Sequence, residues 1–423
     1  MIAVDLSDPA SIDTGSTAFW RLSDDERDEA FALLRRDAPM APMPPVEDEL
    51  VGVLQENPTG YRSIVRYEDI RRISRDPQTF CSGEGVLAGD APLEIREATL
   101  SFISMDAPRH TKLRGLVSSA FTPRQVARIE EGIRRSAKRI VEEAAPTGGG
   151  DFVSLIAKRL PLQTISDMIG VPDSDRERVV AAADALVSTG DERFLAGREP
   201  MAVMGEAIWT LSQFAGELAA HRERSPADDL MTALVEAEID GERLTHAEIS
   251  AWFVLLSVAG NDTTRHTTSH AMRALTLHPD QRALLQDDLE SRLPQAVEEF
   301  VRWTTPVLHF RRTVTREVEL HGERLEPGDK VVMWFLSGNR DEQAFDEPGR
   351  FDVTRDPNYH VGFGGGGPHY CLGASLARTQ LRSIFGELLT QVPDIEVEEP
   401  DPLASAFIRG VKRMECSFTP RGA

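Results

Sequence analysis

Cysteine is scarce in this chain, and the scarcity excludes two classes of protein. The 423 residues contain three cysteines, Cys81, Cys371 and Cys416, which are too few and too scattered for a disulfide framework or a zinc cluster. No run of about 18 apolar residues occurs, so we expect no membrane span. The N-terminus has neither the basic nor the apolar segment of a signal peptide. We therefore expect a cytoplasmic protein, because the cytoplasm keeps thiols reduced.

Basic residues are fewer than acidic ones, with 47 lysines and arginines against 69 aspartates and glutamates. The formal net charge of −22 argues against nucleic acid as a partner. Residues 109–139 depart from this background, with nine lysines and arginines against Glu130 and Glu131. Two interpretations of this basic stretch stay open. One is a solvated helix face, which is the commoner case, and the other is a docking surface for an acidic redox protein.

Helical patterns cover most of the chain. Short alternating segments at 317–320 and 330–334 predict a few local strands. We find neither an internal repeat nor a linker. The sequence therefore predicts a mainly α protein with small β-sheets, organised as one domain over residues 1–423, with residues 1–20 as an N-terminal arm.

One predicted helix is unusually long. Thr245 and Glu248 form a capping-box pattern, so a helix is expected to begin there, and it can continue to His278, just before a proline. Its first part is apolar on all sides, as in a fully buried helix. Gly260 and consecutive threonines then follow, and these are poor choices for a buried helix interior. Such a broken rule often marks a functional site.

Asp262 lies in this interrupted stretch, where an unpartnered carboxylate is unfavourable. Gly260 can let the helix bulge and leave a carbonyl free, which opens a groove beside it. Asp262 and Thr263 then place an acid next to an alcohol, a pair suited to relaying protons into a dry cavity. The alternative is a kink in which threonine hydroxyls satisfy the preceding carbonyls.

The most distinctive segment runs from Phe363 to Gly373 and reads Phe-Gly-Gly-Gly-Gly-Pro-His-Tyr-Cys-Leu-Gly. A helical pattern follows at once, so we expect Cys371 at a helix N-terminus, where the dipole and free N–H groups favour the thiolate. A thiolate in a loop without side chains suits haem iron, because a flat ligand can approach the backbone. The alternative is a buried structural cysteine beside a flexible loop.

Charged pairs complete the pattern. Glu299 and Arg302 lie on one helix face, and a proline-containing loop downstream carries Arg350. We expect one carboxylate held between these two guanidiniums, in a structural role. A buried haem also brings two propionates that need cationic or hydrogen-bonding partners. The candidates are His110, Arg114, Arg312 and His369, although an ordinary surface or salt-bridge role is equally open for each.

Together these segments resemble the cytochrome P450 superfamily of haem-thiolate monooxygenases, in the family's order and from about Trp20 onward. The resemblance implies a triangular α-rich fold with haem b between the long helix and the cysteine helix. It implies Cys371 as the proximal ligand and Asp262 and Thr263 as the source of protons for dioxygen cleavage. The further cofactor contacts implied are His110, Arg114, Ala259, Gly260, Arg312, Phe363, Gly364, His369, Leu372 and Gly373. Phe363 stands eight residues before Cys371, one more than is usual.

A narrower resemblance is to actinobacterial hydroxylases of methyl-branched fatty acids, isoprenoids and sterol side chains. It implies insertion of one oxygen atom of O2 into a C–H bond of an apolar substrate. Segments 83–104 and 181–204 are expected near that substrate, with the individual candidates Leu255, Val258, Val307, Leu308 and Phe407.

The sequence also bears on where the protein would obtain its electrons. The chain has no flavin- or dinucleotide-binding fingerprint, so we expect electrons from a ferredoxin and its NAD(P)H-dependent reductase. Three alternatives stay open: a different natural product as substrate, a peroxide-driven enzyme, and a non-catalytic haem-binding or sensor protein.

Overall fold

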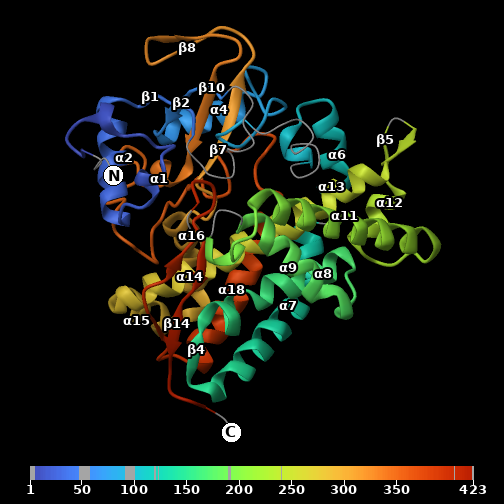
Figure 1. The fold of residues 1–423 in the computed structure, drawn as a ribbon. Helices are drawn as coiled ribbons and strands as arrows, with labels where there is room; N and C mark the ends of the chain where they lie inside the picture. The colour runs from blue at the N-terminus through green and yellow to red at the C-terminus, as the bar shows by residue number, and fades with distance from the viewer. Residues whose placement is uncertain are drawn as a thin grey trace.

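The computed structural model describes residues 5–46, 58–90, 101–118, 121, 123–188, 192–239, 241–403 and 405–421. Helices fill most of this part, and the largest sheet lies at one end (Figure 1). The mainly α fold with small β-sheets is therefore confirmed. No helix in the described ranges is long and apolar enough to cross a membrane.

The largest sheet joins strands that are far apart in the sequence. Its order is β1 (Met40–Met43), β2 (Tyr61–Ile64), β10 (Lys330–Trp334), β7 (His309–Val314) and β3 (Phe80–Cys81). β2 and β10 run parallel, and the other neighbours run antiparallel. The predicted strand at 330–334 is observed as β10, although all five of its residues are buried and the expected alternation of burial is absent.

The N-terminal residues pack onto this sheet. The ring of Phe19, in α1 (Thr17–Trp20), is fully buried against Phe31 of α2 (Asp24–Asp37). The ring of Trp20 lies 5.1 Å from that of Trp334 in β10. The described part of the predicted arm thus belongs to an apolar core at the sheet end of the molecule.

Shorter strands and helices frame the sheet. The predicted strand at 317–320 is observed as β8 (Val318–Leu320), which pairs with β9 (Glu323–Leu325). The other small sheets comprise β4 (Gly149–Asp151), β11 (Glu396–Val397) and β14 (Glu415–Ser417); β12 (Asp401–Pro402) and β13 (Val411–Arg413); β5 (Glu238–Ile239) and β6 (Glu242–Arg243). Two helices pack by the large sheet, α4 (Tyr67–Arg75) and α17 (Phe335–Gly338).

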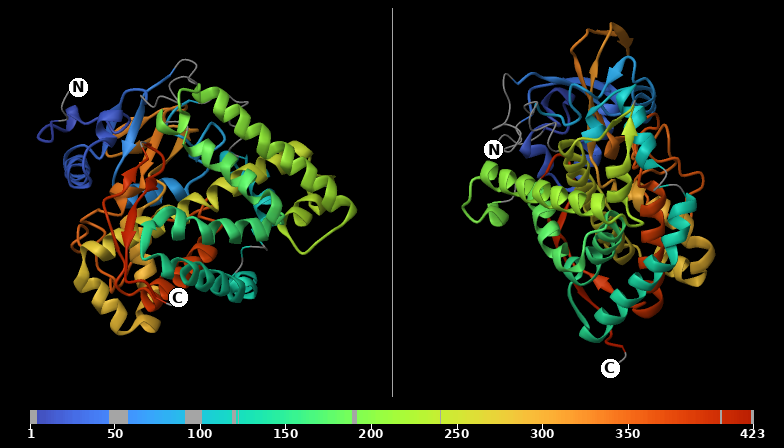
Figure 2. Two further views of the ribbon diagram at one scale, coloured as in Figure 1. Left: turned by 60° about the horizontal axis from the view of Figure 1, so that its bottom comes forward. Right: turned by 90° about the vertical axis from the view of Figure 1, so that its right-hand side faces the viewer.

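The remaining helices build the other end of the molecule, and Figure 2 shows α11 on its outside. They are α6 (Arg109–Ser118), α7 (Pro123–Ala144), α8 (Arg159–Ile169), α9 (Arg176–Val187), α10 (Glu192–Leu195), α11 (Pro200–Arg224), α12 (Leu230–Glu236), α13 (His246–Ala259), α14 (Asp262–Leu277), α15 (Pro279–Asp287), α16 (Leu289–Thr304) and α18 (Ala374–Gln391). Their apolar faces share one large core. This burial, and not helix propensity, supplies most of their stability.

The predicted long helix is two helices, α13 and α14, that meet at Gly260. The capping box at Thr245 and Glu248 is present, so the predicted start is confirmed. A Cβ on Gly260 would lie 2.7 Å from the Cγ1 atom of Ile165 in α8, so only glycine fits there without a shift. The Thr263 hydroxyl donates to the carbonyl oxygen of Ala259 at 2.9 Å. Both interpretations of this stretch therefore hold in part, because the helix is interrupted and a threonine satisfies a carbonyl.

Candidate active site

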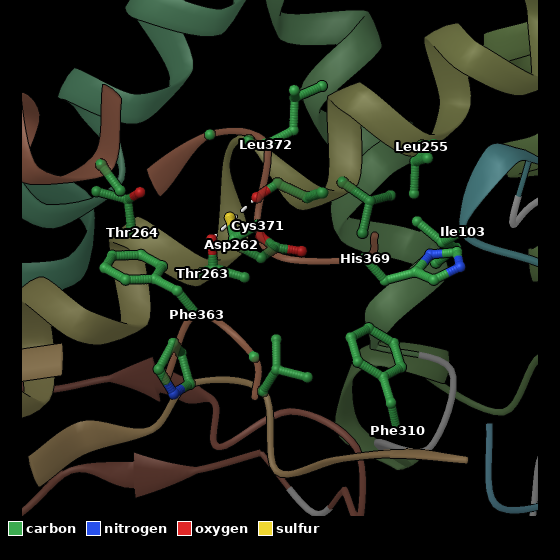
Figure 3. A pocket seen from close by; sticks show the side chains of 18 of the residues that line it. Ile103, Leu255, Asp262, Thr263, Thr264, Phe310, Phe363, His369, Cys371 and Leu372 are labelled. Carbon is green, nitrogen blue, oxygen red and sulfur yellow. Dashed lines mark hydrogen bonds between the residues drawn. The ribbon is translucent and has the colours of Figure 1, made fainter. Parts of the chain in front are cut away.

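A cavity of about 430 Å³ lies inside the molecule where the α13–α14 break and the Cys371 loop approach one another. Its lining is mostly apolar, with a few polar groups from these two segments. Figure 3 shows the side chains of Ile103, Leu255, Phe310 and Phe363 around a common space. A concave, apolar cavity with few polar groups is typical of a site for a small apolar ligand.

Cys371 lines this cavity from the loop just before α18, which begins at Ala374. The residue is exposed, and the surface that it exposes borders the cavity. Burial raises the pKa of the Cys371 thiol, while the Gly373 N–H and the Arg114 and Arg378 guanidiniums oppose the rise. The expected electrostatic partners of a thiolate are thus present, but in this chain by itself desolvation outweighs them.

The glycine loop is shaped by its contact with α4. A Cβ on Gly365 would lie 2.5 Å from the Ser74 hydroxyl oxygen, and one on Gly367 would lie 2.0 Å from the Ser74 carbonyl oxygen. Gly364, Gly366 and Gly367 also have positive φ angles, which residues with side chains rarely adopt. Close packing and backbone conformation therefore require these glycines, in addition to any approach by a flat ligand.

Phe363 packs beside the cysteine despite the longer loop. Its carbonyl oxygen accepts the Cys371 N–H at 3.0 Å, and its ring lies 4.5 Å from the guanidinium carbon of Arg378. Glu298 holds Arg378 with two hydrogen bonds, at 2.6 and 2.8 Å. The extra glycine is thus accommodated, with Phe363 on the cavity wall.

Asp262 is buried, and one of its oxygens has no partner. Oδ1 pairs with the Arg265 guanidinium at 2.9 Å, and the same guanidinium pairs with Asp184 of α9 at 2.8 Å. Oδ2 has no hydrogen-bond partner in the described structure. Burial raises the pKa of Asp262 to about 7, against the opposing effect of Arg265, and Asp184 adds to the rise. A carboxyl group with this pKa exchanges protons near neutral pH.

Four positively chargeable side chains gather at one side of the cavity. Arg114, Arg312 and His369 line it, and the ring of His110 lies 4.2 Å from that of His369. Burial lowers the pKa of His110 to about 4 and that of His369 to about 2, so both imidazoles are neutral at pH 7. Arg114 and Arg312 donate to the carbonyl oxygens of Tyr370 and Arg311, which leaves their charge without compensation at these contacts.

The predicted Glu299 cluster has one wrong member. Glu299 and Arg302 are fully buried and joined by two hydrogen bonds of 2.7 Å. The Arg350 side chain instead lies at the surface and pairs with Glu347, because the loop directs only its carbonyl oxygen inward, to Arg302. Arg355 supplies the second guanidinium, 3.3 Å from Glu299. The predicted arrangement is therefore present with a different arginine.

Of the five residues predicted to contact the substrate, four line the cavity and one does not. Leu255, Val258, Val307 and Phe407 line the cavity. Leu308 does not, because successive side chains of an extended chain point to opposite sides and this one packs in the core of the sheet end. The prediction for Leu308 is therefore wrong.

Other segments also contribute to the wall. Leu87, Phe102, Ile103, Leu186 and Met204 come from the two predicted segments, of which residues 91–100 and 189–191 lie outside the described part. Sequence reasoning missed Phe310 and Phe335. The alternation of β7, read outward from Arg312, would have found Phe310.

The basic stretch forms much of α6 and α7. Arg134 and Arg135 pair with the glutamates four residues earlier, and Arg109 pairs with Glu248 of α13. These side chains are mostly exposed, as on a solvated helix face. Such pairs still leave positive groups at the surface, so both interpretations of the stretch stay open.

Comparisons with known proteins agree with this geometry. A family model described as cytochrome P450 matches residues 160–392. The chain is 43% identical to the methyl-branched lipid omega-hydroxylase of Mycobacterium tuberculosis over 97% of its own length and 95% of that protein. It is 39% identical to the steroid C26-monooxygenase of Rhodococcus jostii over 92% of its length and 81% of that protein. The chain therefore belongs to the cytochrome P450 family.

Solved structures with a similar fold are also cytochromes P450. A Mycobacterium marinum cytochrome P450 in complex with pseudoionone matches with a TM-score of 0.92 and 53% sequence identity, over 95% of this chain and 97% of that one. The protein is thus an oxidoreductase, a cytochrome P450 monooxygenase, and its cofactor is haem b. Proteins of this family use O2 and redox partners and act on apolar substrates.

The residues at the cavity fit haem. An iron porphyrin with two propionates requires a ligand for the iron, room beside the backbone and cationic partners. The cavity offers the sulfur of Cys371, a loop of glycines without side chains, and the guanidiniums of Arg114 and Arg312, which donate to backbone carbonyls. The buried Nε2 atom of His110 has no hydrogen-bond partner in the described structure, and a propionate oxygen would supply one.

Proposed function

We propose that this protein hydroxylates an apolar, lipid-like substrate, namely a methyl-branched fatty acid, an isoprenoid or a sterol side chain. The observation that carries the proposal is the apolar cavity bounded by Cys371 on one element and by the Asp262–Thr263 pair on another. The names of the similar proteins support the lipid class, since they act on methyl-branched lipids and on steroids.

Cys371 would bind the haem iron, and His110, Arg114, Arg312 and His369 would hold the propionates. When bound, the haem would supply activation of dioxygen, and a thiolate ligand would favour cleavage of the O–O bond. Among the residues of the chain, the Gly373 N–H and the Arg114 and Arg378 guanidiniums would favour the anionic sulfur, against the effect of burial. The Leu372 N–H is expected to act in the same direction.

Asp262 and Thr263, at the start of α14, would hold protons and transfer them into the cavity. The free Oδ2 atom of Asp262 is the site from which a proton leaves, and a pKa of about 7 allows it to be replaced. The Thr263 hydroxyl, fixed to the Ala259 carbonyl at 2.9 Å, keeps its oxygen lone pairs free to accept a hydrogen bond. Arg265 and the partly exposed Asp184 link this pair toward solvent.

Electrons would come from a ferredoxin and its NAD(P)H-dependent reductase. The exposed arginines of α6 and α7 support this partner, because an acidic surface is attracted to them at low ionic strength. The intact acid–alcohol pair argues against a peroxide-driven enzyme, which would have no need of such a relay.

The proposal is tested by titrating the purified ferric protein with ligands while following the haem Soret band. The panel comprises a methyl-branched fatty acid, a straight-chain fatty acid, an isoprenoid alcohol, a 3-keto sterol and a small aromatic. A saturable low-to-high-spin shift with the branched, isoprenoid or sterol ligands is expected. Binding to the aromatic alone, or to none, would contradict the substrate class. In a Cys371→Ser variant, survival of the thiolate spectrum would contradict the ligand assignment.

A further inference from the structure

One buried histidine, His309 at the start of β7, bonds two segments of the cavity wall. Its Nδ1 atom lies 2.9 Å from the carbonyl oxygen of Ala406, and its Nε2 atom lies 3.1 Å from the backbone nitrogen of Ala88. Leu87 and Phe407, the neighbours of these two residues, line the cavity. The imidazole therefore connects two wall segments that are more than 300 residues apart in sequence.

The two hydrogen bonds select one form of the ring. A carbonyl oxygen can only accept, so Nδ1 must carry a proton, and a backbone N–H can only donate, so Nε2 must be unprotonated. Burial lowers the pKa of His309 to about 4, which keeps the ring neutral at physiological pH. The ring of Trp334 at 4.8 Å and the ring of Phe407 at 5.6 Å fix its orientation.

The surrounding contacts show why this position controls the wall. Phe310 and Arg312 of β7 line the cavity, whereas His309 and Arg311 alternate with them along the strand. The Arg311 N–H donates to the Val86 carbonyl at 2.7 Å, and the Leu308 N–H donates to the Phe407 carbonyl at 2.8 Å. Each of these backbone bonds holds one of the two segments, and the His309 side chain holds both.

We propose that His309 is a positioning residue for substrate specificity, because its neutral imidazole fixes the segments that carry Leu87 and Phe407 and so sets the shape of the apolar wall. The ligands affected are apolar molecules long enough to reach that wall. This inference rests on the proposed function for the identity of the substrate, but not for the geometry of the wall.

The variants are chosen to separate the two hydrogen bonds from the volume of the ring. His309→Phe keeps an aromatic ring and removes both bonds, and His309→Gln retains one donor and one acceptor. His246→Phe is the matched control, because its side chain is 65% exposed at the start of α13, outside the cavity lining. Each variant is studied as the haem-loaded protein, by Soret titration with a methyl-branched fatty acid and with imidazole.

In His309→Phe, the affinity for the fatty acid is expected to fall about tenfold or more, since two buried backbone groups lose their partners. Imidazole has few atoms with which to contact the wall, so its affinity should stay within about twofold of wild type. His309→Gln should recover part of the loss, and His246→Phe should match wild type. An equal change for both ligands in His309→Phe, or no change for either, would overturn the proposal.

A second measurement decides the matter if the wild-type protein binds no lipid, an outcome that refutes the proposed substrate class alone. Amide hydrogen exchange of residues 84–90 and 405–408 is compared between wild type and His309→Phe. Exchange should rise about tenfold in both segments. Exchange that is unchanged in either segment, or a ¹⁵N spectrum showing His309 protonated at Nε2, would contradict the positioning role.

Discussion

Asp262 shows how single residues set the chemistry of this site. Its carboxyl group is desolvated by α13 and α14, yet it is paired with Arg265 on one oxygen only. Desolvation favours the protonated acid and the pairing favours the anion, and the balance places its pKa at about 7. A proton donor at this position can therefore release and recover its proton near neutral pH.

The pH dependence of product formation follows from that pKa. Below about pH 7 Asp262 holds its proton and can donate it, and above about pH 7 it is increasingly ionised. The yield of product per NAD(P)H should therefore fall as the pH rises through about 7. Asp262→Asn should remove this inflection and leave a low yield at every pH. An inflection that survives in the variant would assign it to another group.

Thr263 gives the second prediction at this scale. Thr263→Ala should leave haem binding intact, while the yield of product per NAD(P)H falls about tenfold or more and the remaining electrons reduce O2 to hydrogen peroxide or water. Thr390→Ala is the control, because that exposed threonine of α18 makes the same bond to a carbonyl four residues earlier. Full coupling in Thr263→Ala would refute the relay assignment.

The elements of the fold were predictable where local chemistry decides them. The capping box, the apolar first half of the long helix and the strand β10 all follow from sequence. The interruption at Gly260 was anticipated as a bulge or a kink, but the division into two helices was not, because the contact with Ile165 of α8 is tertiary. Arg350 and Arg355 lie in one loop, and spacing alone cannot say which arginine turns inward.

The Glu299 cluster separates those two arginines by experiment. Arg302→Lys, which removes the paired hydrogen bonds of a fully buried guanidinium, should lower the free energy of unfolding by about 3 kcal/mol or more. Arg350→Ala should change it by less than about 0.5 kcal/mol, since its side chain is exposed. Urea unfolding of the haem-loaded protein measures both. Equal losses would restore Arg350 to the cluster.

Two glycines in helical regions should respond in opposite directions to alanine. Gly260→Ala drives a methyl group into Ile165 and should reduce stability by about 1 to 3 kcal/mol. Gly205→Ala, in α11 with no atom of another element within 4 Å of the new methyl group, should increase stability by about 0.5 to 1 kcal/mol. Thermal unfolding distinguishes them, and Ile165→Ala should partly rescue Gly260→Ala. A stabilising Gly260→Ala would show that α8 yields at this contact.

At the scale of the whole molecule, the charge distribution is uneven. The chain carries a net charge of −22, yet α6 and α7 together hold a strongly basic stretch. A local excess of positive charge such as this favours the approach of an acidic protein more than the rest of the chain does. An acidic electron donor would be oriented by that difference before any close contact forms.

Charge reversal tests this orientation. Replacing Lys112 and Arg128 by glutamate should slow reduction by ferredoxin severalfold at low salt, and the difference should shrink at about 1 M salt, where charges are screened within about 3 Å. Stopped-flow reduction measures the rate. Equal rates at low salt would make the basic stretch an ordinary solvated helix face.

Insertion of an oxygen atom from O2 into a lipid is the activity proposed for this cytochrome P450, and turnover under ¹⁸O2 measures it. The purified protein is supplied with ferredoxin, ferredoxin reductase, NAD(P)H and the panel member that binds most tightly, and the product is analysed by mass spectrometry. We expect a hydroxylated lipid that carries one ¹⁸O atom. No hydroxylated product, or a hydroxyl oxygen that comes from water, would contradict it.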